Sequence, residues 1–279
     1  MKIIKTLAHN KVAMVGLIVF VLLVLVAVFG PYLYGVSPWK MVQRPFLPPF
    51  ENSQYLLGTD TLGRDVLAGL IHGARISLLV GLISTVIALM IGVPLGAFAG
   101  YHGGWIDDVL MRFTEIFQTV PSFALAIVLV AIFEPSVYSI TAAIALVSWP
   151  PVARLVRGEF LLLRSQEYVL AAKLNGQSNI NIILREILPN SLSPIIVLAS
   201  LMVATAILLE SSLSFLGLGD PDIISWGYMI GASRTVMRQA WWLSFIPGVA
   251  IAITVLALNL LGEGLNEALN PKLSGKRDN

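Results

Sequence analysis

The chain of 279 residues has no cysteine and few charged side chains. Without cysteine it cannot form disulfides, thiolate metal sites or a thiol nucleophile. Only 12% of its residues are charged and 57% are hydrophobic, whereas a soluble domain carries about 25% charged residues. Since 18 basic and 16 acidic residues cannot cover a soluble protein of this size, the composition indicates an integral membrane protein. The net charge of +2 gives no reason to expect a nucleic-acid partner.

The sequence also lacks the common motifs of enzymes. It has no GxxxxGK[ST] run for binding ATP and no GxSxG turn for a nucleophilic serine. His9, His72 and His102 are too scattered to suggest a metal site. We therefore expect a protein that is not an enzyme, binds no metal and holds no cofactor of its own.

Stretches without charge predict six transmembrane helices. About 20 mostly apolar residues cross the roughly 30 Å hydrocarbon layer of a bilayer. The predicted spans lie near 12–33, 77–100, 113–133, 138–157, 188–210 and 241–264. The first is apolar on all sides and is not followed by a small-residue cleavage site, which favours an uncleaved helix over a signal peptide. Residues 12–272 are thus predicted to form one transmembrane domain, between an N-terminal segment 1–11 and a tail 273–279.

The distribution of lysine and arginine predicts the orientation in the membrane. With the N-terminus in the cytoplasm, 12 of the 18 basic residues fall in cytoplasmic segments and 6 fall outside. This excess predicts that both termini are cytoplasmic. Segment 158–187 is then cytoplasmic, and segments 34–76 and 211–240 are external.

The cytoplasmic sequence EYVLAAKLNGQSNINIILREILPN at 167–190 has the most specific pattern. Good helix formers follow Glu167 and predict a short helix, which Gly176 is expected to end. A second helix is predicted to start near Ile180 and to be interrupted at Pro189. The small pair of alanines at 171–172 is expected to leave a surface that the backbone of another protein can approach.

This spacing resembles the EAA loop of ATP-binding-cassette (ABC) importer permeases. Four other segments are similar to the permease branch that handles oligopeptides, dipeptides and nickel. They are LLGTDTLGRDVLAGLIHGARISL at 56–78, GGWIDDVLMRFTEIFQTVPSFALAI at 103–127, LSFLGLGDPDIISWGYMI at 213–230 and NLLGEGLNEALNPK at 259–272. Because they occur in the expected order, the chain resembles the second, C-type permease subunit, a binding-protein-dependent transport system inner membrane component.

The resemblance implies an all-α integral membrane protein, a six-helix permease bundle of the MetI-like type with a cytoplasmic coupling helix. It implies a homologous permease subunit as heterodimer partner, two ABC ATPase subunits that hold ATP and magnesium, an extracytoplasmic solute-binding protein and membrane lipid. The expected location is the cytoplasmic (inner) membrane of a bacterium or archaeon. The expected activity is ATP-driven import of peptides by alternating access.

The resemblance also implies a site where the coupling loop docks into a cleft of the ATPase. Its expected residues are Glu167, Tyr168, Ala171, Ala172, Lys173, Gly176, Leu188 and Pro189. Glu167 is expected either to bridge to the ATPase or to stabilise the helix start, where a negative charge is favoured.

External segment 56–78 is predicted to form a platform for the solute-binding protein. The expected residues are Gly58, Asp60, Gly63, Arg64, Asp65 and Arg75. A helix over 61–74 would let Asp60 cap its start or pair with Arg64 one turn later. The alternative is a self-paired amphipathic helix on the membrane surface.

A third set of residues is expected to form a gate or to line the solute path: Glu115, Glu210, Phe215, Gly217, Gly219 and Trp226. The run 217–221 contains two glycines and a proline and breaks a helix. Glu210 is expected to line the path or to hold this turn. Trp226 is assigned to an aromatic belt at the outer interface, and Arg112 is expected to pair with Asp108 one helical turn away.

Other functions stay open from the sequence. The same machinery could import nickel, glutathione, opines or sugars, because the motifs are shared among these systems. An ion-coupled secondary transporter would need intramembrane carboxylates, for which only Glu115 and Glu210 are candidates.

Overall fold

The computed structural model describes residues 10–269, which are mostly helical and contain no β-strand. The helices are α2 (Lys11–Tyr34), α3 (Val66–His102), α4 (Gly104–Thr119), α5 (Ser122–Ile132), α6 (Val137–Leu163), α7 (Glu167–Leu174), α8 (Asn179–Asn181), α9 (Leu188–Leu213), α10 (Trp226–Ser233) and α11 (Trp242–Leu269), with π-helical turns η1 (Ile182–Ile187) and η2 (Ser214–Leu218). Most of the N-terminal segment 1–11 and the whole tail 273–279 lie outside the described residues.

Five helical segments are long and apolar enough to cross a membrane, and there are six if α4 and α5, which are bent by 78° relative to each other, count as one broken span. The structure therefore has the all-α membrane architecture expected from the sequence. The predicted span 113–133 is not one straight helix, because Pro121 has no backbone N–H and holds Val120 in an extended conformation. Helix α3 is also longer than predicted and begins at Val66.

The predicted interruption at Pro189 is wrong. Segments α8, η1 and α9 follow one another without a break from Asn179 to Leu213. Pro189 lies in the first turn of α9, where the wider π-helical turn η1 precedes it and accommodates the missing N–H donor.

Helices α3 and α6 form the closest helix pair because glycines on α3 let the two backbones meet. A Cβ atom on Gly96 would lie 2.3 Å from the carbonyl oxygen of Ala153. Gly92 and Gly100, one turn before and after, face α6 at similarly short range. Small residues at this spacing allow close packing in membrane helices, where a hydrophobic driving force between helices is missing.

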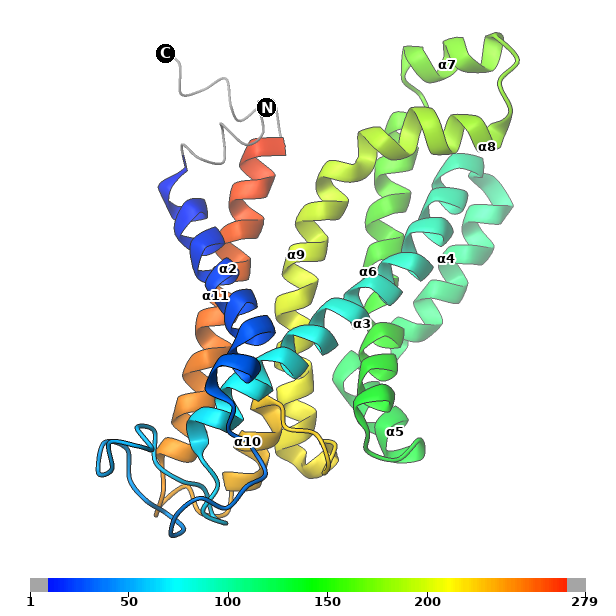
Figure 1. Cartoon of the computed structure of the whole chain (residues 1–279). Helices are drawn as coiled ribbons and strands as arrows, with labels where there is room; N and C mark the ends of the chain where they lie inside the picture. The colour runs from blue at the N-terminus through cyan, green and yellow to red at the C-terminus, as the bar shows by residue number, and fades with distance from the viewer. Residues whose placement is uncertain (1–9, 270–279) are drawn as a thin grey trace.

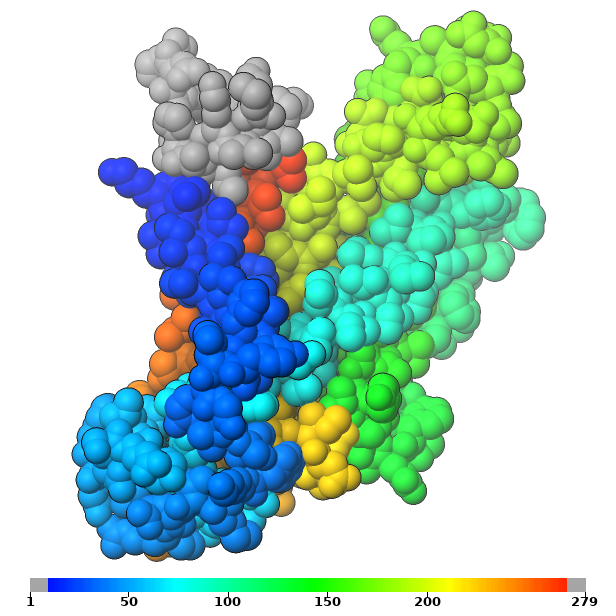
Figure 2. Space-filling model, in the orientation of Figure 1, coloured from blue at the N-terminus to red at the C-terminus, as the bar shows by residue number. Residues whose placement is uncertain are grey.

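Helix α9 packs against both members of this pair, α2 packs against α3, and α11 packs against α2 and α9 (Figure 1). Helix α2 packs against α11, and the Asn10 amide donates a 2.5 Å hydrogen bond to the Glu267 carboxylate. The first turn of α2 and the last turn of α11 lie at the same end of the molecule as α7 and α8, whereas loop 35–65 and α10 lie at the opposite end. Figure 2 shows a gap between α2 with α11 on one side and the part of the molecule that carries α7 on the other. The gap widens toward the end of the molecule where α7 lies.

Candidate functional site

Helix α7 presents one apolar side outward and packs the other on the helices beneath it. Val169 and Ala172 are buried in a cluster with residues of η1 and α6. Leu170 and Leu174 point outward, and Leu174 is 89% exposed. Ala171 is exposed as expected, but Ala172 faces inward, so the alanine pair does not form one external surface. Leu170 and Leu174 were not among the residues predicted for the coupling loop, although their spacing of four residues indicates a common helix face.

The end of α7 is fixed by the turn at Gly176, as expected. Gly176 has a φ of +75°, a conformation that favours glycine. Its N–H donates to the Lys173 carbonyl at 3.0 Å, and Gln177 N–H donates to the Ala172 carbonyl at 3.1 Å. Glu167 lies in the first turn of α7. Leu188 and Pro189 lie at the start of α9, in the supporting layer rather than on α7.

Polar contacts link α7 to α3 and α8. The Lys173 ammonium lies 5.2 Å from the ring centroid of Tyr101, near the end of α3, and the Tyr101 hydroxyl donates to Asn179 at 2.8 Å. Burial raises the pKa of Tyr168, and the negative charge of Glu186 raises it further. These contacts connect α7 with the end of α3, which in turn bonds to α8.

Loop 35–65 at the opposite end is folded into a compact unit. Asp60 accepts hydrogen bonds from the backbone N–H groups of Leu62 and Arg64, both at 2.8 Å. Asp65 caps α3 through Leu67 N–H and also accepts from the Tyr34 hydroxyl at 2.6 Å. The predicted helix from residue 61, with Asp60 as its cap, is therefore wrong, because Asp60 stabilises a turn and Asp65 starts the helix.

The Arg64 side chain does not pair with Asp60 either. Its guanidinium lies 4.6 Å from the ring centroid of Trp39. Gly58 and Gly63 have φ values of +76° and +78° and belong to the same loop, whereas Arg75 is exposed further along α3.

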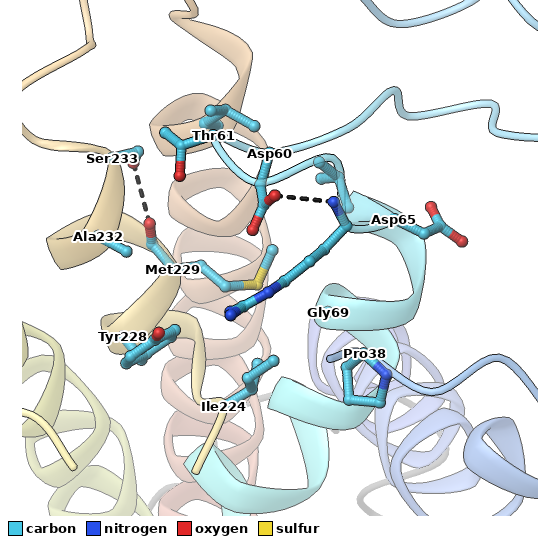
Figure 3. Close-up of a pocket in the computed structure, with 13 residues that line it drawn as sticks. Pro38, Asp60, Thr61, Asp65, Gly69, Ile224, Tyr228, Met229, Ala232 and Ser233 are labelled. Atoms are coloured by element: carbon cyan, nitrogen blue, oxygen red, sulfur yellow. Dashed lines mark hydrogen bonds between the residues drawn. The ribbon is translucent and has the colours of Figure 1, made fainter. Parts of the chain in front are cut away.

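A cavity of about 40 Å³ lies between this loop and α10 (Figure 3). Asp60, Arg64, Tyr228 and Met229 are among its lining residues. Since one water molecule needs about 10–15 Å³ of such volume, the cavity holds a few waters at most and is too small for a peptide.

Glu210 holds the turn that follows α9. Its buried carboxylate accepts hydrogen bonds from the hydroxyls of Ser225 at 2.6 Å, Ser214 at 3.0 Å and Ser211 at 3.3 Å. These bonds join α9, η2 and the start of α10 around Gly217, whose φ of +90° breaks the helix. Of the two roles considered for Glu210, the structure shows the one that holds the turn.

We expect Glu210→Ala to destabilise the permease by about 3 kcal/mol, because it leaves buried hydroxyl donors without their acceptor. The midpoint of thermal unfolding in detergent should fall clearly. Ser212→Ala is the control, because the exposed Ser212 hydroxyl donates only to Leu208 of its own helix. Equal midpoints for the two variants would contradict this role of Glu210.

Trp226 lies in the interior rather than in an aromatic belt. It is 1% exposed, its indole N–H donates to the Leu70 carbonyl at 2.9 Å, and its backbone N–H donates to Ser77 at 3.1 Å. It therefore fastens α10 to α3. Gly219 lies close to Ser214 in the same turn, and Phe215 is exposed.

Three neighbouring cavities form a hollowed face on α4, α5, α6 and α9, which extends to η2, α10 and α11 at one end. The middle cavity, of about 460 Å³, is lined partly by the polar side chains of Gln118, Ser148 and Thr205. One neighbour, of about 380 Å³, includes Phe215. The third, of about 440 Å³, includes Glu115. We call these the middle, α10-side and charged cavities.

Adjacent residues line consecutive cavities, so the three follow one another. Ser122 and Leu209 line the middle cavity, whereas Phe123 and Leu208 line the α10-side cavity. At the other end, Arg154 of the charged cavity donates to Gln118 of the middle one. Glu115 therefore lies at the opposite end of the hollowed face from Phe215, and the predicted gate residues do not form one site.

The ion pair predicted between Asp108 and Arg112 is absent from the described residues, and the neighbouring Asp107 pairs with Arg157 instead. The Arg157 guanidinium donates to both carboxylate oxygens of Asp107, at 2.5 and 2.7 Å. Arg112 makes no ion pair with Asp108 within residues 10–269. A partner fifty positions away in sequence could not be identified from helical spacing.

Comparison with known proteins confirms the resemblance seen in the sequence. Residues 92–275 match the family described as binding-protein-dependent transport system inner membrane component. Residues 2–49 match the N-terminal TM domain of oligopeptide transport permease C.

Individual relatives support the same family assignment. The chain is 41% identical to the di/tripeptide transport system permease protein DppC of Pseudomonas aeruginosa (strain UCBPP-PA14), over 96% of this chain and 91% of that protein. It is 39% identical to the oligopeptide transport system permease protein OppC of Bacillus subtilis (strain 168), over 95% and 87%. An inward-facing structure of the MetNI methionine ABC transporter shares the fold, with a TM-score of 0.61 at 17% identity over 72% of this chain and 96% of the other. The chain therefore belongs to the family of binding-protein-dependent transport system inner membrane components and is a permease subunit of an ABC importer in a bacterial inner membrane.

Proposed function

We propose that this permease imports dipeptides and short oligopeptides along the hollowed face, driven by ATP and magnesium bound in two partner ATPase subunits. The observation that carries the proposal is the row of three cavities, of about 380, 460 and 440 Å³. Each has a volume in the range of about 300–1,000 Å³ that suits small-molecule sites. The relatives named above transport di-, tri- or oligopeptides.

The path needs a second wall from a homologous permease. Gln118, Ser148 and Thr205 place polar groups among apolar helices. In a membrane, polar groups face water or another protein rather than lipid. A heterodimer in which both subunits contribute a hollowed face would enclose an aqueous path.

The two ends of the molecule suit two different partners. The exposed apolar side of α7, with Leu170, Ala171 and Leu174, fits a cleft on the ATPase. This assignment puts α7 and both termini in the cytoplasm, and loop 35–65 with α10 outside, where a solute-binding protein would deliver the peptide. Binding and hydrolysis of ATP would then move α7, and its contacts with α3 and α9 would shift the permease between outward-open and inward-open states.

The function is tested by uptake of dialanine into vesicles that contain the reconstituted complex and ATP. We expect uptake that requires the solute-binding protein and active ATPases. Uptake that persists with inactive ATPases would instead support an ion-coupled transporter. Uptake of nickel, sugars or opines, but not of dialanine, would assign the permease to another solute.

A further inference from the structure

The charged cavity of the hollowed face lies toward the α7 end. It is lined by Met111 and by five charged residues, Asp108, Arg112, Glu115, Arg154 and Arg157. Helix α4 starts immediately after α3, whose residue Tyr101 is hydrogen-bonded to α8. In the proposed orientation a solute would therefore meet these charges last, just before the cytoplasm.

Three of the five charged side chains, those of Asp108, Arg112 and Glu115, are presented to the cavity, whereas Arg157 and Arg154 also bond to residues of this subunit. The ion pair with Asp107 neutralises the charge of Arg157, which also lines the cavity. On α4, Arg112 follows Asp108 by four residues and Glu115 follows Arg112 by three. The three side chains therefore share one face of the helix, and all of them are exposed. Within residues 10–269, Arg112 and Glu115 have no hydrogen bond or ion pair. The cavity thus offers two carboxylates and, with Arg154 on α6, two guanidinium groups.

Charged side chains are costly in a membrane protein and mark the route of charged solutes. Equal numbers of both signs suit a solute that itself carries both. A divalent cation would favour carboxylates without arginines nearby, and a sugar would need no charged groups. The cavity of about 440 Å³ is large enough for a short peptide.

We propose that the charged cavity is a transit site for zwitterionic peptides. The carboxylates of Asp108 and Glu115 would bind the α-ammonium group, and the guanidinium groups of Arg112 and Arg154 would bind the α-carboxylate. This inference rests on the proposed function in taking the hollowed face as the path, and it adds that this permease itself recognises the charged ends of the peptide.

The test compares dialanine uptake by complexes carrying Arg112→Gln, Glu115→Gln or Arg154→Gln. Each variant loses one charge-assisted hydrogen bond to the peptide, so uptake should fall about tenfold. Arg112→Lys keeps the positive charge and should retain most of the uptake. Glu159→Gln removes a carboxylate at the same end of the molecule that does not line the cavity, and it should transport normally.

Normal uptake by all three glutamine variants would overturn the transit site while leaving the peptide importer intact. Loss of the partner permease from the purified complex, together with loss of uptake, would instead assign the charges to the subunit interface and would also overturn it. Failure of the unaltered complex to import dialanine would mean that the proposed function itself is wrong. The two failures are therefore distinguishable.

Discussion

Replacing Gly176 with proline should abolish peptide uptake while the permease still inserts into the membrane. Proline fixes φ near −65°, whereas this position requires +75°, and it also removes the N–H that donates to Lys173. The turn would open, and α7 would lose its fixed position on Val169 and Ala172. ATP hydrolysis and dialanine uptake should be measured together in reconstituted vesicles. We expect hydrolysis that the solute-binding protein no longer stimulates.

Gly176→Asn is the matched control, because asparagine adopts the left-handed conformation more readily than other residues. It should keep at least about half of the uptake, since the strain is on the order of 1 kcal/mol. If the proline variant imports dialanine at the normal rate, then the turn after α7 has no part in coupling.

Gly96→Leu should prevent stable folding, the largest effect on stability that we expect. Even the first side-chain carbon would lie 2.3 Å from the backbone oxygen of Ala153, so α3 and α6 must separate. Overpacking a well-packed core costs about 1–3 kcal/mol, and here the obstacle is a helix backbone that cannot rotate away. The yield of monodisperse permease in detergent and its unfolding temperature measure the effect.

Gly158→Leu on α6 is the control for this prediction. A Cβ at Gly158 meets no other atom within 4 Å. This variant should be produced in normal amounts, because the added side chain has room. Equal yields of the two leucine variants would show that α3 and α6 do not pack as closely as the structure indicates.

Much of the architecture follows from where the sequence places its few charges. Stretches without charge locate the long helices, because lipid excludes charged groups. The helix formers after Glu167 and the turn at Gly176 likewise predict α7 from local preferences alone. By contrast, the bend between α4 and α5 was missed, although Pro121 inside the predicted span is the residue that causes it.

The hollowed face could not be derived in the same way. Gln118, Ser148 and Thr205 lie on different helices, and their proximity depends on how those helices pack. The ion pair between Asp107 and Arg157 likewise depends on how α4 packs against α6. Sequence resemblance indicated a transport path, but only tertiary structure shows which surface could form it.

Cysteine labelling can show whether the hollowed face is the aqueous path. Because the chain has no cysteine of its own, a single Ser148→Cys substitution in the middle cavity gives a unique site in this subunit. In the assembled complex, a charged, water-soluble thiol reagent should add its mass to this subunit. Leu22→Cys on the exposed apolar surface of α2 should stay unlabelled, because we expect this position to face lipid. Labelling at residue 22 without labelling at residue 148 would show that the hollowed face is not the aqueous path.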